Sequence, residues 1–306
     1  MHFSTLLLSA LSLTTLASSA ALPKRQATTT SIYKFTSPKA AEGIATRTNG
    51  KIIVSFFDKG ELWQIDPATK TAAKVATFTD TTCSAAIAEV APDVFAVVAG
   101  NYASSGGNKP GSWGVWTVDF SAAGGGSETA PKTSLVKKVP ESGFWNGLSA
   151  FANGTVLVGD ASKGQVWRLD VYTGRYSVAI EDATMKPSGN LPMGIDGIRY
   201  ANGSIYYTNI FANKFYKLAV DATGAKVGSP TTIWSNQMAD DMYVTPEGVA
   251  YVAASGSIQK VTADGKASKF ATVSSATAVT RGTGEKDRET LFIAGSDGTI
   301  SSVKMA

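Results

Sequence analysis

The sequence predicts an all-β fold, a six-bladed β-propeller of four-stranded blades, closed into a ring by the N-terminal strand of the mature chain. Three observations predict it. The 306 residues include 30 glycines and only 17% charged residues, which favours strands joined by many turns. One strand–turn–strand motif recurs along the chain. The last copy of the motif lacks an outer strand, whereas a β-prone segment without a blade lies near the N-terminus.

The first 25 residues predict a secretory leader. An apolar run from Leu6 to Leu16 is followed by the small residues 17–20, which fit a small-x-small cleavage site. The run is shorter than the roughly 20 residues that a membrane span requires. We expect a signal peptide at 1–20 and a short pro-segment at 21–25 that ends in the dibasic pair Lys24-Arg25. A buried N-terminal helix is the alternative. The leader predicts a secreted protein.

The segment Ser31–Phe35 is the first β-prone stretch after the leader. We expect it to pair with the incomplete last copy of the motif, because joining the two ends closes the ring without a free sheet edge. A propeller closed in this way needs no disulfide. The single domain would then span residues 26–306.

The six copies of the motif follow in order, each with a turn between two apolar strands. They are residues 47–55, 91–99, 151–159, 200–208, 245–253 and 286–294. Their turn residues stand at 49, 93, 153, 202, 247 and 288, so the period is 40 to 60 residues. A second strand pair follows most copies, and four strands per period form one propeller blade. A β-sandwich is the alternative fold, but a regular sixfold period argues against it.

Composition excludes several kinds of chemistry. The chain has one cysteine, Cys83, and one histidine, His2, so no disulfide and no Cys/His metal cluster can form within it. Because His2 lies in the leader, the mature chain would also lack imidazole catalysis. Without the leader, 26 basic residues face 24 acidic ones, and no basic stripe predicts nucleic-acid binding. We expect a monomer with no membrane span, and we expect Cys83 to be a small buried thiol.

Two sequons, at Asn153 and Asn202, are compatible with glycosylation on a secretory route. Each is followed by glycine, and Asn-Gly is also a strong hairpin signal. We therefore interpret both as turns first and as glycosylation sites second.

The residues that begin the first strand of each blade are candidates for the functional site. In a propeller these strands line the central axis, so we expect these six side chains to face one another: Glu42, Ala85, Asn146, Asp196, Asp240 and Thr277. Converging carboxylates repel one another and lose hydration. Two arrangements would relieve the repulsion and the loss of hydration. The oxygens could bind a Ca²⁺ ion, or a raised pKa could keep one carboxyl group protonated. The alternative is that these are turn residues bonded to their own backbone, which we favour for Asp241.

Large apolar side chains flank these ring positions in the sequence. We predict that they line the pocket and bind an apolar or mixed apolar and polar small molecule: Phe144, Trp145, Met193, Met238 and Tyr243. Packing between blades is the alternative, since it also uses Trp and Met.

The six-bladed pattern, with Glu42, Asn146-Gly-Leu148, Asp196-Gly-Ile198 and Asp240, resembles the SMP-30/gluconolactonase/NHL-type propellers. In the lactonase members of that family, matching Glu, Asn and Asp residues bind a divalent cation, and an Asp acts as general base. The resemblance thus implies Glu42, Asn146, Asp196 and Asp240 as metal ligands of a Ca²⁺-dependent lactone or ester hydrolase. Asp196 stands where these members have a second Asn.

The leader, length and motifs also resemble the fungal hetero-Diels–Alderases of tropolone sesquiterpenoid biosynthesis. That resemblance implies a cyclase of fungal secondary metabolism, which joins a tropolone quinone methide to a humulene-type alkene without a cofactor. Glu42, Asn146, Asp196 and Asp240 would be its catalytic residues, in a pocket that orients both reactants and polarises the heterodiene. The calcium-dependent hydrolase and a non-catalytic secreted binding propeller are the alternatives.

Overall fold

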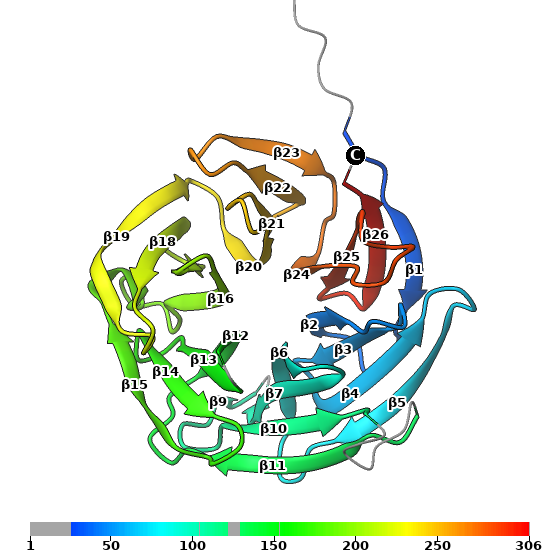
Figure 1. Cartoon of the computed structure of the whole chain (residues 1–306), viewed down its shortest axis with the longest axis horizontal. Coiled ribbons are helices and arrows are strands. Elements are labelled where there is room, and N and C mark those ends of the chain that lie inside the picture. Colours follow the sequence, from blue (N-terminus) through cyan, green and yellow to red (C-terminus); the bar gives the residue numbers. More distant parts are fainter. Residues whose placement is uncertain (1–25, 104, 122–128, 153, 306) are drawn as a thin grey trace, which may run out of the picture.

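A computed structural model describes residues 26–305 except 104, 122–128 and 153. The predicted signal peptide, the pro-segment and the sequon residue Asn153 therefore lie outside the described residues. The regular structure of the described chain consists almost entirely of strands, which form six four-stranded sheets around a central axis (Figure 1). This confirms the predicted six-bladed β-propeller.

Each blade is an antiparallel sheet whose first strand lies innermost. Blade 1 comprises β2 (Ala41–Thr46), β3 (Ile52–Phe56), β4 (Lys59–Asp66) and β5 (Thr71–Thr77). Blade 2 comprises β6 (Cys83–Ala91), β7 (Val94–Gly100), β10 (Gly114–Asp119) and β11 (Lys132–Lys138). Blade 3 comprises β12 (Trp145–Ala152), β13 (Thr155–Asp160), β14 (Gln165–Asp170) and β15 (Tyr176–Glu181).

The second half of the ring repeats this order. Blade 4 comprises β16 (Ile195–Ala201), β17 (Ser204–Asn209), β18 (Lys214–Val220) and β19 (Lys226–Ser235). Blade 5 comprises β20 (Ala239–Val244), β21 (Ala250–Ala254), β22 (Ser257–Val261) and β23 (Ala267–Ala271). Blade 6 comprises β24 (Ala276–Arg281), β25 (Thr290–Gly295), β26 (Thr299–Lys304) and, as its outer strand, β1 (Thr30–Lys34).

The two ends of the chain close the ring, as the sequence predicts. β1 pairs antiparallel with β26, and the Lys34 ammonium lies 2.6 Å from the Asp297 carboxylate. Phe35 follows β1 and packs edge-on against Phe56 and Trp63 of blade 1, with ring centroids 4.8 and 5.6 Å apart. The N-terminal segment thus completes blade 6 and also links it to blade 1.

The apolar core lies between neighbouring blades. The second strand of each blade is the most thoroughly buried, because its two faces pack against the blades on either side. Such strands have continuous apolar runs, as in Ile52-Ile-Val54. The described part of the chain has no helix that is long and apolar enough to span a membrane.

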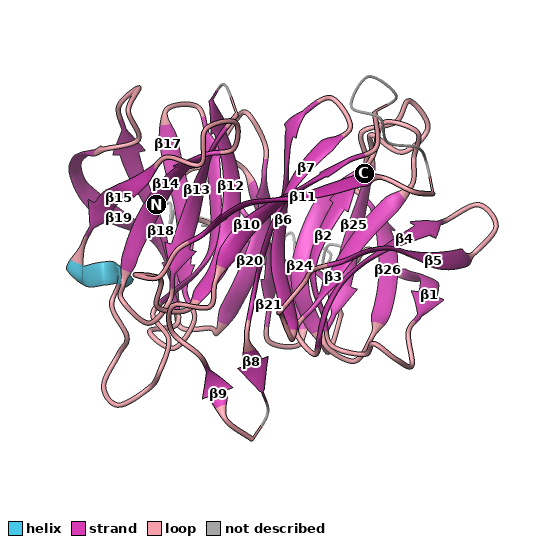
Figure 2. Cartoon of the chain, turned by 90° about the horizontal axis from the view of Figure 1, so that it is seen from below, coloured by secondary structure: helices cyan, strands magenta, loops and turns pink. Residues whose placement is uncertain are grey.

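One face of the ring carries two additions to the blades. A small hairpin, β8 (Tyr102–Ala103) and β9 (Gly107–Asn108), projects from blade 2 on this face (Figure 2). The 3-10 helix η2 (Ala183–Met185) begins the long connection from β15 to β16. Asp182 caps this helix by accepting a hydrogen bond from the Thr184 amide. The hairpin lies on the face that carries the pocket described next, since Tyr102 of β8 packs against the pocket residue Phe57.

Candidate active site

The six ring residues lie at the same point of the six innermost strands, as predicted. In each strand the register with the second strand shifts at this point, for example between Ala41 and Ile44 and between Ile195 and Ile198. The same irregularity occurs in the other four innermost strands. A β-bulge frees residues from the ladder and redirects their side chains. The repeated bulge therefore turns Glu42, Asn146, Asp196 and Asp240 toward the axis.

Buried hydroxyl groups hold neighbouring bulges together. Thr208 of β17 accepts a hydrogen bond from the Gly197 amide (3.0 Å) and donates one to the Asp240 carbonyl (2.7 Å). Ser55 of β3 accepts from the Gly43 amide at 2.9 Å and donates to the Ala85 carbonyl. Each hydroxyl thereby joins its own blade to the next one and satisfies backbone groups that the bulge leaves unpaired.

Glycine follows the ring residue where neighbouring strands approach most closely. A Cβ on Gly147 would overlap the backbone carbonyl oxygen of Asp196, and a Cβ on Gly197 would lie 2.6 Å from the Asp241 Cα. These contacts explain the Asn146-Gly and Asp196-Gly pairs that the sequence shows.

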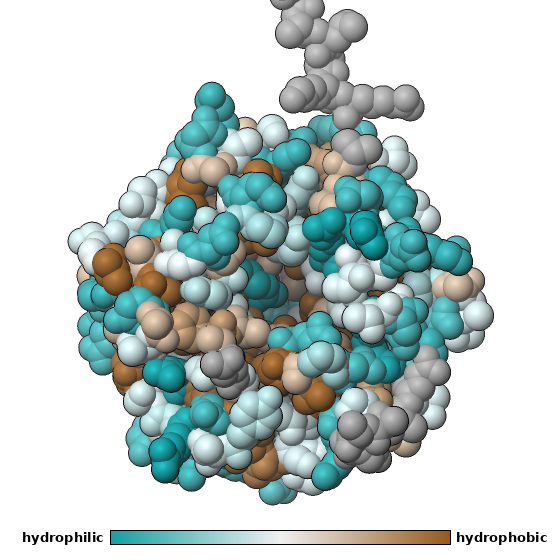
Figure 3. Space-filling view, in the orientation of Figure 1, coloured by the Kyte–Doolittle hydropathy of each residue, from teal (hydrophilic) through white to brown (hydrophobic). Residues whose placement is uncertain are grey.

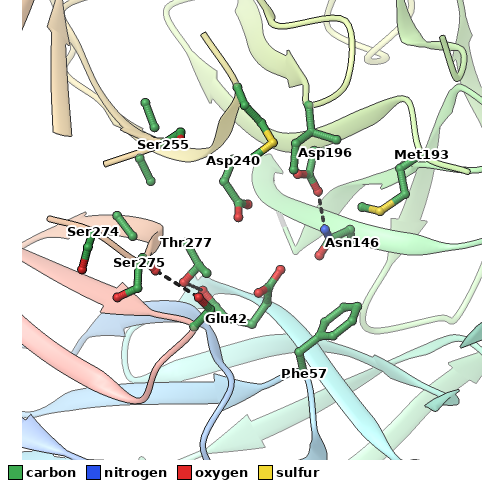
Figure 4. Close-up of a pocket in the computed structure, with 16 residues that line it drawn as sticks. Glu42, Phe57, Asn146, Met193, Asp196, Asp240, Ser255, Ser274, Ser275 and Thr277 are labelled. Carbon is green, nitrogen blue, oxygen red and sulfur yellow. Dashed lines mark hydrogen bonds between the residues drawn. The ribbon is translucent and has the colours of Figure 1, made fainter. Parts of the chain in front are cut away.

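The ring forms the floor of an axial pocket of about 330 Å³. Its walls come from loops on one face of the ring. Figure 4 shows the arrangement, with acidic and amide groups between a hydroxyl-bearing side and an apolar side. The lining residues are Glu42, Phe57, Asn146, Met193, Asp196, Ile210, Met238, Asp240, Ala253, Ala254, Ser255, Ser274, Ser275, Ala276, Thr277 and Ser296.

The carboxyl groups of the floor hold their protons more tightly than usual. Burial, together with the charges of Asp196 and Asp241, raises the pKa of Glu42 from 4.5 to about 8. Burial and the charge of Asp241 raise the pKa of Asp196 to about 7. Burial also raises the pKa of Asp240 well above its ordinary value, with contributions from Asp196 and Glu42. Near neutral pH the floor therefore carries carboxylic acids, which can donate hydrogen bonds or protons.

Asn146 links two of these groups. Its Nδ2 donates to Asp196 Oδ1, and a hydrogen bond from Asn146 also lowers the pKa of Glu42. Asp196 is 1% exposed, and its second oxygen, Oδ2, has no partner among the described residues. A buried carboxyl oxygen without a partner is costly, so this atom is available to a ligand or a proton.

An ion pair lies beneath the floor. Asp241, which we interpreted as a turn residue, accepts from its neighbour's amide at Met242 (2.8 Å) and forms an ion pair with Arg199. Only about 10 Å³ of space remains in this part of the channel. Beyond it a second mouth of about 250 Å³, lined partly by Arg199 and Glu89, opens at the centre of the opposite face, which Figure 3 shows. The axial pocket is thus closed at its base.

The predicted pocket-lining residues divide into two groups. Met193 and Met238 do line the pocket, but Phe144, Trp145 and Tyr243 do not. Trp145 directly precedes a ring residue on β12, so the twofold period of a strand turns it into the packing against Trp167. Phe144 is buried behind the pocket wall, against Tyr102 and Trp113. The Tyr243 hydroxyl lies 3.5 Å from the Arg281 guanidinium, outside the pocket.

Sequence reasoning missed Phe57 and the serines of blades 5 and 6. Phe57 follows the buried Phe56 at the end of β3, so the alternation of the strand places it on the other side of the chain. The adjacent pair Phe56-Phe57 at the end of an apolar strand is the signal in the sequence that could have pointed to Phe57 as a pocket residue. The serines stand in turns between strands, where serine is common for reasons of turn geometry, and nothing in one sequence marks them as pocket residues.

The structure also places the single cysteine and the second predicted glycosylation site. Cys83 is fully buried at the start of β6, as expected, and burial raises the pKa of its thiol. Asn202 is exposed with φ of 47° in the turn between β16 and β17, which confirms the turn and leaves glycosylation a prediction. Among the described residues no three His, Cys, Asp or Glu side chains form a group that would hold a metal ion.

No protein-family model matches the chain. In sequence, it is 26% identical over 297 residues to a protein of a Phoma species named "Putative hetero-Diels-Alderase", covering 83% of this chain and 82% of the relative. A protein of Sarocladium schorii with the same description is 25% identical over 221 residues, covering 63% of this chain and about half (52%) of the relative. These matches confirm the predicted resemblance to hetero-Diels–Alderases.

Solved structures of low sequence identity share the fold. A gluconolactonase from Xanthomonas campestris superposes with a TM-score of 0.65 at 13% identity, over 91% of this chain and 89% of that one. Regucalcin from Agrobacterium tumefaciens, a calcium-binding protein, gives a TM-score of 0.62 at 13% identity, over 87% and 92% of the two chains. A luciferin-regenerating enzyme gives 0.65 at 13% identity, over 91% and 95%. At this identity the likeness shows the propeller fold alone.

Proposed function

We propose that the protein is a cyclase that catalyses a hetero-Diels–Alder cycloaddition in the axial pocket, without a cofactor. The observation that carries this proposal is a pocket with one apolar side and a floor of proton-holding carboxyl groups. The similarity to named hetero-Diels–Alderases supports it. A tropolone quinone methide and a humulene-type alkene are the reactants that we propose.

The proposed reaction needs orientation and a hydrogen-bond donor. The heterodiene C=C–C=O and the alkene form one C–C and one C–O bond while three π bonds become one, so no atom is lost and no oxidant is required. Holding both reactants in one pocket removes much of the entropic barrier of a bimolecular reaction. A neutral carboxyl group of Glu42, Asp196 or Asp240 donates to the carbonyl oxygen, where negative charge increases in the transition state.

The test is a cycloaddition assay with the purified chain, an enzymatically or thermally released quinone methide, and humulene. We expect adduct formation above the uncatalysed rate, and unchanged activity after treatment with a chelator. Asp240→Asn and Glu42→Gln should reduce the rate by about tenfold or more, since each replaces an acidic carboxyl donor with a weaker amide donor that cannot transfer a proton. Glu285→Gln, an exposed position on a loop outside the pocket, is the control. A rate equal to the uncatalysed one would contradict the proposal.

A calcium-dependent lactone or ester hydrolase is the second candidate, favoured by the unpartnered buried Oδ2 of Asp196. The donor types suit Ca²⁺, because Glu42, Asn146, Asp196 and Asp240 all offer oxygen. Since the described residues form no group of three carboxyls around a common ion, these side chains would have to move closer together to bind it. These residues would hold the ion, which would polarise a lactone carbonyl. Tight stoichiometric Ca²⁺ binding in calorimetry, together with lactone hydrolysis that a chelator abolishes, would favour this candidate over the cyclase. Ligand binding with neither activity would favour the non-catalytic binding propeller.

A further inference from the structure

The axial pocket has two chemically different sides. Figure 4 shows Ser255, Ser274 and Ser275 on one side of the floor, and Phe57 and Met193 on the other. The hydroxyl groups come from the turns of blades 5 and 6, where Met238 and small alanine side chains also line the pocket, and Phe57 and Met193 come from blade 1 and the connection before β16. A pocket that bound one uniformly apolar molecule would need no such division.

The hydroxyl side combines fixed groups with free ones. Ser275 Oγ donates to Asp297 at 2.7 Å, and the Ser275 carbonyl accepts from the Ser296 amide at 2.8 Å, so these two turns are tied together. The hydroxyls of Ser255 and Ser274 are exposed and have no hydrogen-bond partner among the described residues. Each therefore offers one donor and two acceptor sites to a bound molecule.

The apolar side is held rigidly from behind. The Phe57 ring lies 4.4 Å from the Tyr102 ring of the β8–β9 hairpin and 6.0 Å from the Phe144 ring, measured between centroids. Trp113 packs on Phe144 at 5.3 Å, and its indole donates to Asn108 at 2.7 Å. Phe144 is thus part of the support for the wall and does not contact the pocket.

Met193 stands on a connection that is also anchored. Asn209 is 2% exposed, and its side-chain Nδ2 donates to the carbonyls of Thr184 and Lys186 at 2.9 and 2.8 Å. The Gly194 amide, next to Met193, donates to the Ala161 carbonyl at 2.7 Å. A fixed backbone with a flexible thioether suits contact with a branched hydrocarbon.

We infer that the two sides separate the two reactants: the oxygenated heterodiene lies against Ser255 and Ser274, and the hydrocarbon alkene lies against Phe57 and Met193. This inference rests on the proposed cyclase function, and it assigns a chemical class to each half of the pocket. The carboxyl floor lies between the halves, where the carbonyl of the heterodiene meets a donor and the reacting carbon atoms of both molecules meet each other (Figure 4).

The experiment measures binding of two probes, tropolone and humulene, to the full chain by equilibrium dialysis. Removing both free hydroxyls, in Ser255→Ala/Ser274→Ala, should weaken tropolone binding by about 3- to 10-fold per lost hydrogen bond and leave humulene binding within about twofold. Met193→Ala should weaken humulene binding by about tenfold and leave tropolone binding within about twofold. Matched controls are Ser268→Ala on the exposed face of β23 and Leu135→Ala on β11.

The outcomes separate this inference from the proposed function. If each pocket variant weakens the binding of tropolone and humulene equally, the assignment of the two reactants to separate sides of the pocket is wrong. If the wild-type chain binds both probes with the expected pattern but does not accelerate the cycloaddition, the division holds and the cyclase proposal fails. If the wild-type chain binds neither probe, the proposed use of the pocket fails and the division fails with it.

Discussion

At the scale of single residues, the floor of the pocket depends on where protons and charges reside. Glu42, Asp196 and Asp240 hold protons because burial disfavours their charged forms and because each is close to the others. Burial raises the pKa of Asp241 as well, but Arg199 pairs with it and opposes this rise. The carboxylate beneath the floor is thus partly compensated by a cation, while the carboxyl groups in the floor are left to a proton or a ligand.

Glu42→Gln is expected to change the pH dependence of stability. A carboxyl group with a raised pKa holds a proton in the folded state that it loses in the unfolded state, so the folded state loses stability as pH rises from about 4.5 through about 8. The wild type should therefore melt at lower temperature at pH 8.5 than at pH 5, and Glu42→Gln should reduce this loss by ~2–4 kcal/mol. Thermal denaturation across this pH range measures it. An identical pH profile in the variant would show that Glu42 ionises normally.

Arg199→Met is expected to destabilise the fold. It leaves Asp241, buried to 7% exposure, without its ion-pair partner, and it removes the hydrogen bond from Arg199 to the Leu148 carbonyl at 2.9 Å. Losing one partner of a buried pair costs about 3 kcal/mol. Urea denaturation measures the loss. The control is Arg168→Met, which removes a half-buried arginine that has no buried ion-pair partner in the described part of the chain and donates to the Thr223 carbonyl at 3.0 Å. Adding Asp241→Asn to Arg199→Met should restore part of the stability.

At the scale of elements, the bulge in each innermost strand brings the ring residues of the six blades together at the axis. Twofold alternation alone would place ring residues and their neighbours on opposite faces of a regular ladder. The bulge rotates the ring residues to the axis and leaves backbone groups that Ser55 and Thr208 satisfy. Phe144 and Trp145 remain in the packing between blades because the bulge begins after them.

Gly147→Ala is expected to disturb the ring and the fold together. The new Cβ would overlap the Asp196 carbonyl oxygen, so β12 and β16 must move apart. Overpacking against backbone costs about 3 kcal/mol and should displace the Asn146–Asp196 hydrogen bond. The free energy of unfolding measures the first effect and probe binding the second. Gly106→Ala, where the nearest atom would lie 4.0 Å from the Cβ, should leave both unchanged.

At the scale of the whole molecule, closure of the ring determines the geometry of the axis. β1 covers the edge of β26, and Phe35 joins blade 6 to blade 1. An uncovered β26 would present unpaired backbone groups and would leave the first and last blades without a fixed distance. Since the pocket takes its walls from blades 1, 5 and 6 among others, its shape depends on this closure.

Truncation of residues 26–35 is expected to loosen the ring. A chain that begins at residue 36 should melt at least about 10 °C lower than one that begins at Gln26, because it loses the β1 ladder, the Lys34–Asp297 pair and the Phe35 contacts. It should also associate through the exposed edge of β26, which size-exclusion chromatography detects. Equal melting temperatures and a single monomer peak for both chains would contradict this role for β1.

The sequence by itself determined the number of blades, the closing strand and the identity of the ring. These follow from local pairing, because a repeat of strand and turn signals specifies each blade and the same position in every repeat lies at the same radius. The tertiary structure alone decided which neighbours of the ring reach the pocket. Phe57 and the serines entered it, whereas Phe144, Trp145 and Tyr243 did not, because that depends on bulges and on contacts between blades. The ion pair between Asp241 and Arg199, which lie 42 residues apart in sequence, could not be predicted either, because it is a contact between two blades.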